Sequence, residues 1–210
     1  TIISDYKQSY MKYGVHFEKD TWITLLNVVI GITDQLFEYD LTKKFSKSDS
    51  SKTRQLLVDL CFSVIQLSGL SDDDIWSNFK NYCLKWNSNI DFIQIWGQYL
   101  VTLFSNMNII AYRQKKSLKF SGGVYSVDNP ISDKMVKFLF FNHLSFVDVK
   151  IILDDVTLMN KFAQIMSELI AKSDIVIGSL DFCYLLKRQY PSEPFLKLFG
   201  PSLTFFPQLD

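Results

Sequence analysis

Apolar residues recur at helical spacing through most of the chain, and most densely between residues 21 and 37. In this segment two faces of a helix carry large apolar side chains. The first face comprises Trp22, Leu25, Val29, Ile32 and Leu36, and the second comprises Ile23, Ile30 and Phe37. A helix that is apolar on two faces has to be covered on two sides. We therefore predict that this helix lies inside a stack of helices and not on the rim of a small domain.

The same spacing predicts helices elsewhere in the chain. Their expected ranges are 4–14, 21–39, 51–67, 71–86, 90–112, 130–143, 156–172 and 174–190, although Val176–Ile177 is also compatible with a strand. The longest irregular stretch, residues 117–128, contains Gly122–Gly123 and is compatible with a short hairpin. About seven to nine antiparallel helices with short links match an all-α fold, an α-solenoid-like array of the HEAT or armadillo type.

The tail of the chain differs in composition from the rest. Residues 191–210 hold four of the five prolines and are interpreted as a Pro-rich tail with one short helical turn at Phe195–Phe199. We therefore predict a helical array domain over residues 1–190, followed by this tail. The chain starts at Thr1 and not at methionine, so we expect a fragment of a longer protein. No signal-peptide pattern is visible. An array cut from its neighbours exposes an apolar face, and self-association of the fragment is expected.

Polar residues and glycines mark the ends of the expected helices. Asp20 is a predicted N-cap for the helix over 21–39, and Ser71, followed by Asp72–Asp74, is a predicted N-cap for the helix over 71–86. Gly69 is well placed to end the helix before it. Gly31 lies in mid-helix, where glycine costs about 1 kcal/mol relative to alanine. Either a neighbouring helix approaches closely there, or the glycine occurs by chance.

Charge and cysteine usage restrict the class of partner. Lysine plus arginine equals aspartate plus glutamate, 22 of each, which does not favour a nucleic-acid or anionic-membrane binder. No apolar run reaches the length of about 18 residues that a membrane span needs. The three cysteines are far apart in apolar stretches, which favours buried free thiols in a reducing, cytoplasmic compartment over a disulfide or a zinc site. They are Cys61, Cys83 and Cys183.

The aromatic load is heavy, with 18 phenylalanines, 10 tyrosines and 4 tryptophans. One interpretation is a large core in a chain of AT-rich codon usage. The other is an exposed apolar patch that binds a partner.

Few residues of the sequence are candidates for catalysis or for binding a cofactor or metal. The two histidines, His16 and His143, are far apart and have no Cys or Asp at ligand spacing, so a core or rim position is favoured over a catalytic base. No nucleotide, zinc-protease or nucleophile-elbow motif occurs. Asp72–Asp74 and Asp154–Asp155 are at expected helix starts, and the cations after the helix over 90–112 are interpreted as complements of its C-terminus, with a phosphate site as the alternative. We predict no catalytic, cofactor-binding or metal-binding residue, and no cofactor. The cations are Arg113, Lys115, Lys116 and Lys119.

Several segments together resemble a known family. The sequence Thr-Trp-x-x-Leu-Leu-x-x-Val-Ile-Gly-Ile-Thr-Asp at 21–34 is similar to a helix in the N-terminal, non-catalytic region of the Ral GTPase-activating protein subunits, and tuberin has a broadly similar helical architecture. Matching packing residues follow in order at Ile75, Trp76, Phe79, Trp86, Trp96 and Leu103, and then over 132–146. Residues 194–200 resemble a Leu-Phe-Gly segment, but Ser202 stands where the family usually has tryptophan. Residues 147–190 show no match.

The resemblance implies a scaffold and not an enzyme. In the family, the catalytic asparagine belongs to a separate C-terminal domain, and its His-x-x-Gly-Asn-Asp-like motif is absent here. The implied role is a helical array that assembles with a partner subunit of a GTPase-activating complex and thereby acts indirectly on a Ras-like GTPase of the Ral, Rap or Rheb type. The alternatives are a protein- or peptide-binding α-solenoid unrelated to GTPases and an enzyme with an unrecognised helical fold.

Overall fold

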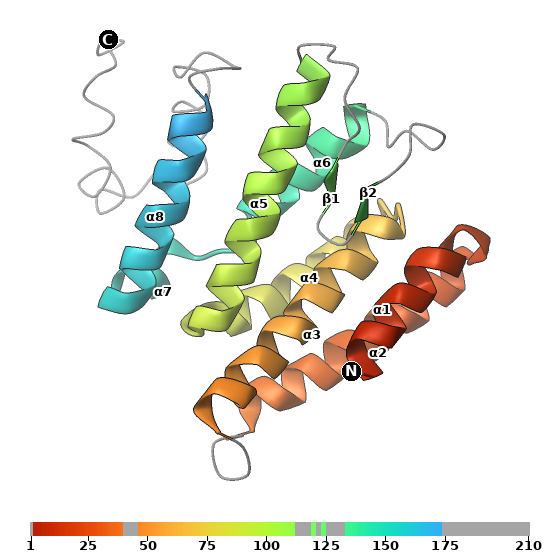
Figure 1. Cartoon of the computed structure of the whole chain (residues 1–210), viewed down its shortest axis with the longest axis horizontal. Coiled ribbons are helices and arrows are strands. Elements are labelled where there is room, and N and C mark those ends of the chain that lie inside the picture. Colours follow the sequence, from red (N-terminus) through yellow and green to blue (C-terminus); the bar gives the residue numbers. More distant parts are fainter. Residues whose placement is uncertain (1, 40–45, 112–118, 121–122, 125–132, 174–210) are drawn as a thin grey trace. The chain divides into compact units, whose positions relative to one another are not determined.

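The computed structural model describes residues 2–39, 46–111, 119–120, 123–124 and 133–173 (Figure 1). These residues contain eight α-helices and one pair of very short strands. The chain divides into two compact units, residues 1–99 with 121–123 and residues 100–120 with 124–210, and each unit is described by itself. None of the described helices has the length and apolarity needed to cross a membrane.

The elements of the described residues follow a simple order. They are α1 (Ile2–Tyr13), the 3₁₀ turn η1 (Gly14–His16), α2 (Lys19–Glu38), α3 (Lys47–Leu67), α4 (Asp73–Lys85), the 3₁₀ turn η3 (Trp86–Ser88), α5 (Ile90–Ala111), β1 (Lys119–Phe120), β2 (Gly123–Val124), α6 (Asp133–Leu144), α7 (Val149–Leu153) and α8 (Val156–Ser173). Strands β1 and β2 pair inside the stretch where a hairpin was considered.

Each predicted helix that falls on described residues is present, and one helix was missed. Helix α7 has five residues, too few for apolar periodicity to reveal, and it begins where the Asp148 carboxylate accepts a hydrogen bond from the Lys150 backbone N–H at 2.9 Å. The first residues of the helix expected over 130–143, the helix over 174–190 and the turn at 195–199 lie outside the described residues.

Two predicted N-caps are wrong. Helix α2 begins at Lys19 with Glu18 as N-cap, so Asp20 lies within the first turn. Helix α4 has Asp72 as its N-cap in place of Ser71, without a side-chain capping bond. The Asp72 carboxylate is instead engaged by the ammonium group of Lys19. At the start of α4, the Asp72 carboxylate therefore forms an ion pair with α2 and does not cap its own helix.

The ends of α3 show one missed signal and one correct prediction. The helix begins four residues before its predicted start, because the Ser46 hydroxyl accepts a hydrogen bond from the Asp49 N–H at 3.1 Å. The sequence Ser46-x-x-Asp49 carried this signal within residues 40–50, whose lysines and serines favour a polar loop between two expected helices. After Ser68, the C-cap of α3, Gly69 has a φ of 63°, which is the left-handed conformation expected of a glycine that ends a helix.

Ion pairs and hydrogen bonds set the directions of the helices in the first unit. Lysine–carboxylate pairs join the start of α2 to the start of α4, through Lys19 and Asp72, and the end of α2 to the end of α4, through Lys85 and Asp34. These two helices therefore run parallel. Helices α3 and α5 also run parallel, since Ser51 bonds to Asp91 at their starts and α3 meets Tyr99 further along. Helix α3 packs on α2 in the opposite direction (Figure 1).

The core of the first unit is centred on α3. Between Leu57 and Gln66 every side chain is buried except that of Asp59, which is half-buried. The Phe62 ring lies within ring-contact distance of three aromatic rings, with centroid separations of 5.7 Å to Phe79, 6.0 Å to Phe92 and 5.1 Å to Tyr99. Each such pair contributes about 0.5–1.5 kcal/mol beyond the area that it buries.

Helix α2 is less enclosed than its sequence suggested. Trp22, Val29 and Ile30 are buried, as the two-faced pattern predicts. Ile32, which was assigned to the first buried face, is 47% exposed. The helix that is surrounded on most sides is α3, and α2 keeps one side open to solvent.

The second unit contains the C-terminal part of α5 with α6, α7 and α8. The rings of Phe104 and Phe140 lie 5.7 Å apart between their centroids, and this contact joins α5 to α6. Helix α8 buries one stripe and packs against α7. The buried residues of that stripe are Leu158, Phe162, Ile165, Met166 and Leu169.

A tight contact at Gly14 gives a stability prediction. A Cβ atom on Gly14 would lie 2.7 Å from Cζ2 and 2.9 Å from Cη2 of the buried Trp22 ring. We expect Gly14→Ala to lower the free energy of unfolding by about 1–3 kcal/mol, because the ring has to move in a packed core. Urea unfolding followed by circular dichroism measures this change.

Gly31 provides the matched control. A Cβ atom at Gly31 meets nothing within 4 Å, so no neighbouring helix among the described residues requires glycine there. Gly31→Ala should therefore raise the stability by up to about 1 kcal/mol, through helix propensity. Equal effects of the two substitutions would contradict the close contact between Gly14 and Trp22.

Candidate functional site

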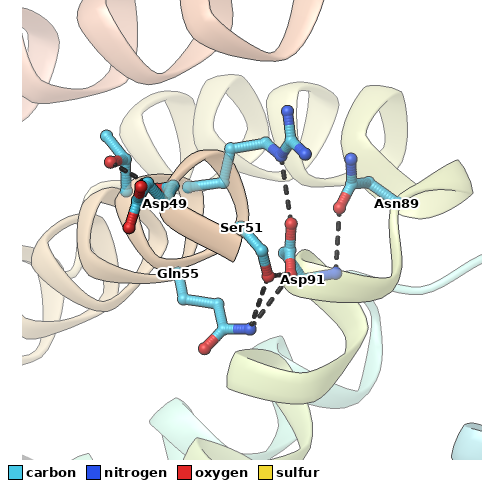
Figure 2. Close-up of polar contacts among 7 residues, drawn as sticks. Asp49, Ser51, Gln55, Asn89 and Asp91 are labelled. Atoms are coloured by element: carbon cyan, nitrogen blue, oxygen red, sulfur yellow. Dashed lines mark hydrogen bonds and ion pairs between the residues drawn. The ribbon is translucent and has the colours of Figure 1, made fainter. Parts of the chain in front are cut away.

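The densest polar cluster joins the start of α3 to the start of α5 (Figure 2). At its centre is Asp91, which is only 4% exposed. Its Oδ1 accepts hydrogen bonds from the Ser51 hydroxyl and, at 3.0 Å, from the Gln55 amide. Its Oδ2 accepts one from the Arg54 Nε at 3.0 Å, and its backbone N–H donates to Asn89 Oδ1 at 2.9 Å. One turn of α3 therefore satisfies both carboxylate oxygens.

This arrangement suits a structural role better than a chemical one. A general base needs a free lone pair directed at a substrate. Both oxygens of Asp91 already accept hydrogen bonds from α3, and the Arg54 guanidinium is held by the same carboxylate. Sequence reasoning missed this cluster, because neither the spacing of Ser51, Arg54 and Gln55 nor the aspartate near a helix start distinguishes it from an ordinary capped helix.

A second cluster lies at the ends of α2 and α4. Lys85 Nζ lies 2.8 Å from Asp34 Oδ2 and 2.5 Å from Glu38 Oε1. The Trp86 indole N–H donates to the other oxygen of Asp34 at 3.0 Å. The hydrogen bonds to Asp34, and then to Glu38, raise the pKa of Lys85 above its ordinary value. The lysine is therefore held in its charged form and is a poor nucleophile.

The described thiols are buried. Cys61 and Cys83 are free and enclosed, which confirms the prediction for these two, whereas Cys183 lies outside the described residues. Burial raises the pKa of Cys61 to about 12 and that of Cys83 well above its ordinary value. The Thr33 hydroxyl lies 3.3 Å from the Cys61 sulfur. Because the thiolate is the reactive form, both side chains are unreactive in the folded protein.

The two histidines occupy different environments. His143 is fully buried in α6, with its ring centroid 5.1 Å from that of Phe146. Burial lowers the pKa of His143 to about 3, so the imidazole is neutral near pH 7. His16 is exposed at the end of η1. The histidine at 143 is thus a core residue, as its apolar neighbours in the sequence indicated.

The predicted acidic and basic candidates do not converge within the described part of the chain. No group of three His, Cys, Asp or Glu side chains there could hold a metal ion. Asp73 and Asp74 lie in the first turn of α4, where carboxylates complement the helix dipole. Asp155 accepts hydrogen bonds from the N–H groups of Thr157 and Leu158 at the start of α8. The cations that follow α5 belong to residues whose side chains are not described.

The first unit also carries an apolar groove between α1, α2 and α3. Its volume is about 310 Å³, and Thr53 is its only lining residue outside the apolar and aromatic classes. It is lined by Tyr6, Tyr10, Leu25, Val28, Val29, Ile32, Leu36, Thr53, Leu57 and Leu60. Most aromatic rings of the described residues are in the core, but Tyr6 is not. The interpretation as core is therefore confirmed for most of these rings, and an apolar patch that binds a partner stays a prediction.

Comparison with known proteins identifies one family. The family model of the RALGAPB N-terminal domain matches residues 1–114, which include α1 to α5. No curated protein and no solved structure matches the chain.

The buried imidazole of His143 makes stability depend on pH. The unfolded chain takes up a proton near pH 6.5, but the folded chain does so only near pH 3, because burial lowers the pKa. Acid therefore favours the unfolded state, and stability falls as the pH drops through this window. Between pH 7 and pH 5 we expect a loss of about 2 kcal/mol from this residue, measured by urea unfolding.

Two variants separate this effect from other titrations. His143→Leu should unfold with a smaller pH dependence than the wild type over the same range. His16→Gln leaves the buried imidazole in place and should keep the wild-type dependence. A His143→Leu protein with the wild-type pH dependence would contradict the burial of a neutral imidazole.

Proposed function

Because the chain belongs to the family of the RALGAPB N-terminal domain, we propose that it is a non-catalytic helical scaffold of a GTPase-activating complex. In this role the chain assembles with a partner subunit and so regulates a Ras-like GTPase of the Ral, Rap or Rheb type indirectly. The family match over residues 1–114 carries the proposal. The region that the family model describes is the N-terminal region of a Ral GTPase-activating protein subunit.

The polar chemistry of the described residues supports a role without catalysis. Activation of GTP hydrolysis requires a residue that reaches the nucleotide and stabilises charge or orients water. Two charged groups that could do such work, Asp91 and Lys85, are engaged in holding helices together. Asp91 accepts hydrogen bonds from Ser51, Arg54 and Gln55, and Lys85 is paired with two carboxylates of α2.

The order of helices supports an array of the HEAT or armadillo type. Parallel helices in such arrays form two layers, and each helical pair packs on the next. Helices α2 and α4 run parallel through their end-to-end ion pairs, and α3 and α5 run parallel through Asp91 and Tyr99. The Lys7–Asp59 pair joins α1 to α3. We propose that residues 1–190 form this array and that residues 191–210 form a Pro-rich tail.

The remaining parts of the proposal follow from the family. The site of action is the cytoplasm, where Ras-like GTPases signal, and the partner is a protein. The chain uses no cofactor, metal or catalytic residue of its own in this role.

A binding and hydrolysis experiment tests the proposal. The purified chain is mixed with a partner subunit of a Ral GTPase-activating complex, and complex formation is measured by size-exclusion chromatography with light scattering. In parallel, single-turnover GTP hydrolysis by a Ral GTPase is measured with the chain alone. We expect a stable complex with the subunit and a hydrolysis rate equal to the intrinsic rate, because a scaffold of this kind supplies no catalytic residue to the nucleotide.

The two readouts can each contradict the proposal. Acceleration of hydrolysis by about tenfold or more with the chain alone would show a catalytic role, since that change corresponds to about 1.4 kcal/mol of transition-state stabilisation. Absence of any complex with the partner subunit would contradict a role in assembly. Heat-unfolded chain serves as the control for non-specific association.

A further inference from the structure

Large apolar side chains are exposed along one side of α1 and α2. We define the α1–α2 face by Tyr6, Tyr13, Val28, Ile32 and Tyr39, each of which is about half exposed or more. Tyr6 and Tyr13 are seven residues apart on α1, and Val28 and Ile32 are four residues apart on α2. Tyr39, seven residues after Ile32, is the C-cap of that helix. Such spacing places residues on one side of a helix. Six of the ten exposed large apolar residues in the described part of the chain precede residue 40.

The α1–α2 face combines projecting side chains with a hollow beside them. Tyr6, 63% exposed, and Val28, 54% exposed, stand at the rim of the groove, and the buried residues Leu57 and Leu60 of α3 line its inner side. The groove lies between α1, α2 and α3, where α1 packs on α3. A surface with projecting side chains beside a groove can be complementary to a second copy of itself.

The size of this face fits a protein interface between two copies. From the exposed fractions, its five side chains present about 450 Å² of apolar surface. A standard interface buries about 800 Å² per partner, of which about 57% is apolar, or roughly 450 Å². The patch therefore supplies the apolar area of one side of a stable dimer interface. Its area lies within the range of the largest apolar patch on a typical monomer, about 300–600 Å².

The charge pattern favours a second copy as the occupant. The exposed side of α2 that carries Val28 has no charged residue from Thr21 to Gln35, and it consists of Thr21, Thr24, Val28, Gly31, Ile32 and Gln35. Close to the axis of a two-fold contact a residue meets its own copy, so a charge on this side of α2 would face a like charge. The nearby charges of Asp34 and Glu38 are paired with Lys85.

We infer that the α1–α2 face is a homodimer interface, in which the α2 helices of two copies pack across a two-fold axis near Gly31. The open space around Gly31 allows the two helix backbones to approach closely. This inference does not rest on the GTPase-activating role, because it uses only area, shape and charge. Binding to a partner subunit and dimerisation are separate measurements, and either can fail alone.

Sedimentation velocity from about 5 to about 200 µM tests the inference. The wild-type chain should change from its monomer mass of 24.4 kDa to twice that mass as concentration rises. Val28→Glu places two like charges in the interface and should weaken dimerisation by at least about tenfold. Val156→Glu is the matched control, since Val156 is 69% exposed on α8 and outside the face. It should dimerise as the wild type does.

Gly31→Lys separates dimerisation from folding. Lysine has a higher helix propensity than glycine, so the melting temperature of the monomer should rise. The same substitution places a charged side chain where the two α2 backbones approach each other, so dimerisation should weaken by at least about tenfold. A variant that is more stable yet more monomeric supports an interface at this helix.

Three results would overturn the inference. A wild-type chain that remains monomeric at about 200 µM excludes a dimer of useful affinity. Equal weakening by Val28→Glu and Val156→Glu would place the contact elsewhere. A monomeric wild type whose binding to a Ral GTPase-activating partner subunit is lost in Val28→Glu would assign the face to that subunit in place of a second copy.

Discussion

The enclosure of α3 is the constraint on which the first unit depends. Its apolar half places Phe62 against rings from α4 and α5, and its polar half bonds to Asp91 at the start of α5. The two halves of α3 make different contributions to the structure. Apolar burial supplies the driving force for packing, whereas a buried carboxylate is tolerated only if its oxygens are bonded. Serine, arginine and glutamine from one turn of α3 meet that requirement, and so they also fix the register of α3 against α5.

The polar residues of the described chain act mainly as connectors between helices. Lys19 and Lys85 join the two ends of α2 to α4, and Lys7 joins α1 to α3. Cys61, Cys83 and His143 are buried without taking up charge near neutral pH. The chain's membership of the RALGAPB N-terminal domain family is consistent with a role in which assembly carries the function.

Sequence periodicity was sufficient to predict the longer helices, but not the five-residue α7 or the environments of the helices. The position of α2 followed from the spacing of Trp22 and Val29, and Gly69 marked the end of α3. The exposure of Ile32 could not be predicted, because periodicity identifies an apolar face without showing whether a neighbour covers it. The partners of Asp91 were also hidden, since 36 to 40 residues separate it from Gln55, Arg54 and Ser51 and no local pattern links them. Capping at Ser46 was readable in principle, but the surrounding lysines and serines suggested a loop.

The most direct test of this account is the stability of the Asp91→Asn variant, measured by urea unfolding. An asparagine keeps the shape of the side chain but loses the charge, so one bonded oxygen becomes a donor facing other donors. If Asp91 fixes α3 to α5, the free energy of unfolding should fall by about 3 kcal/mol, whereas Asp154→Asn at an exposed site should change it by less than about 0.5 kcal/mol. Equal, small effects of the two substitutions would show that α3 does not depend on this carboxylate and would contradict the account.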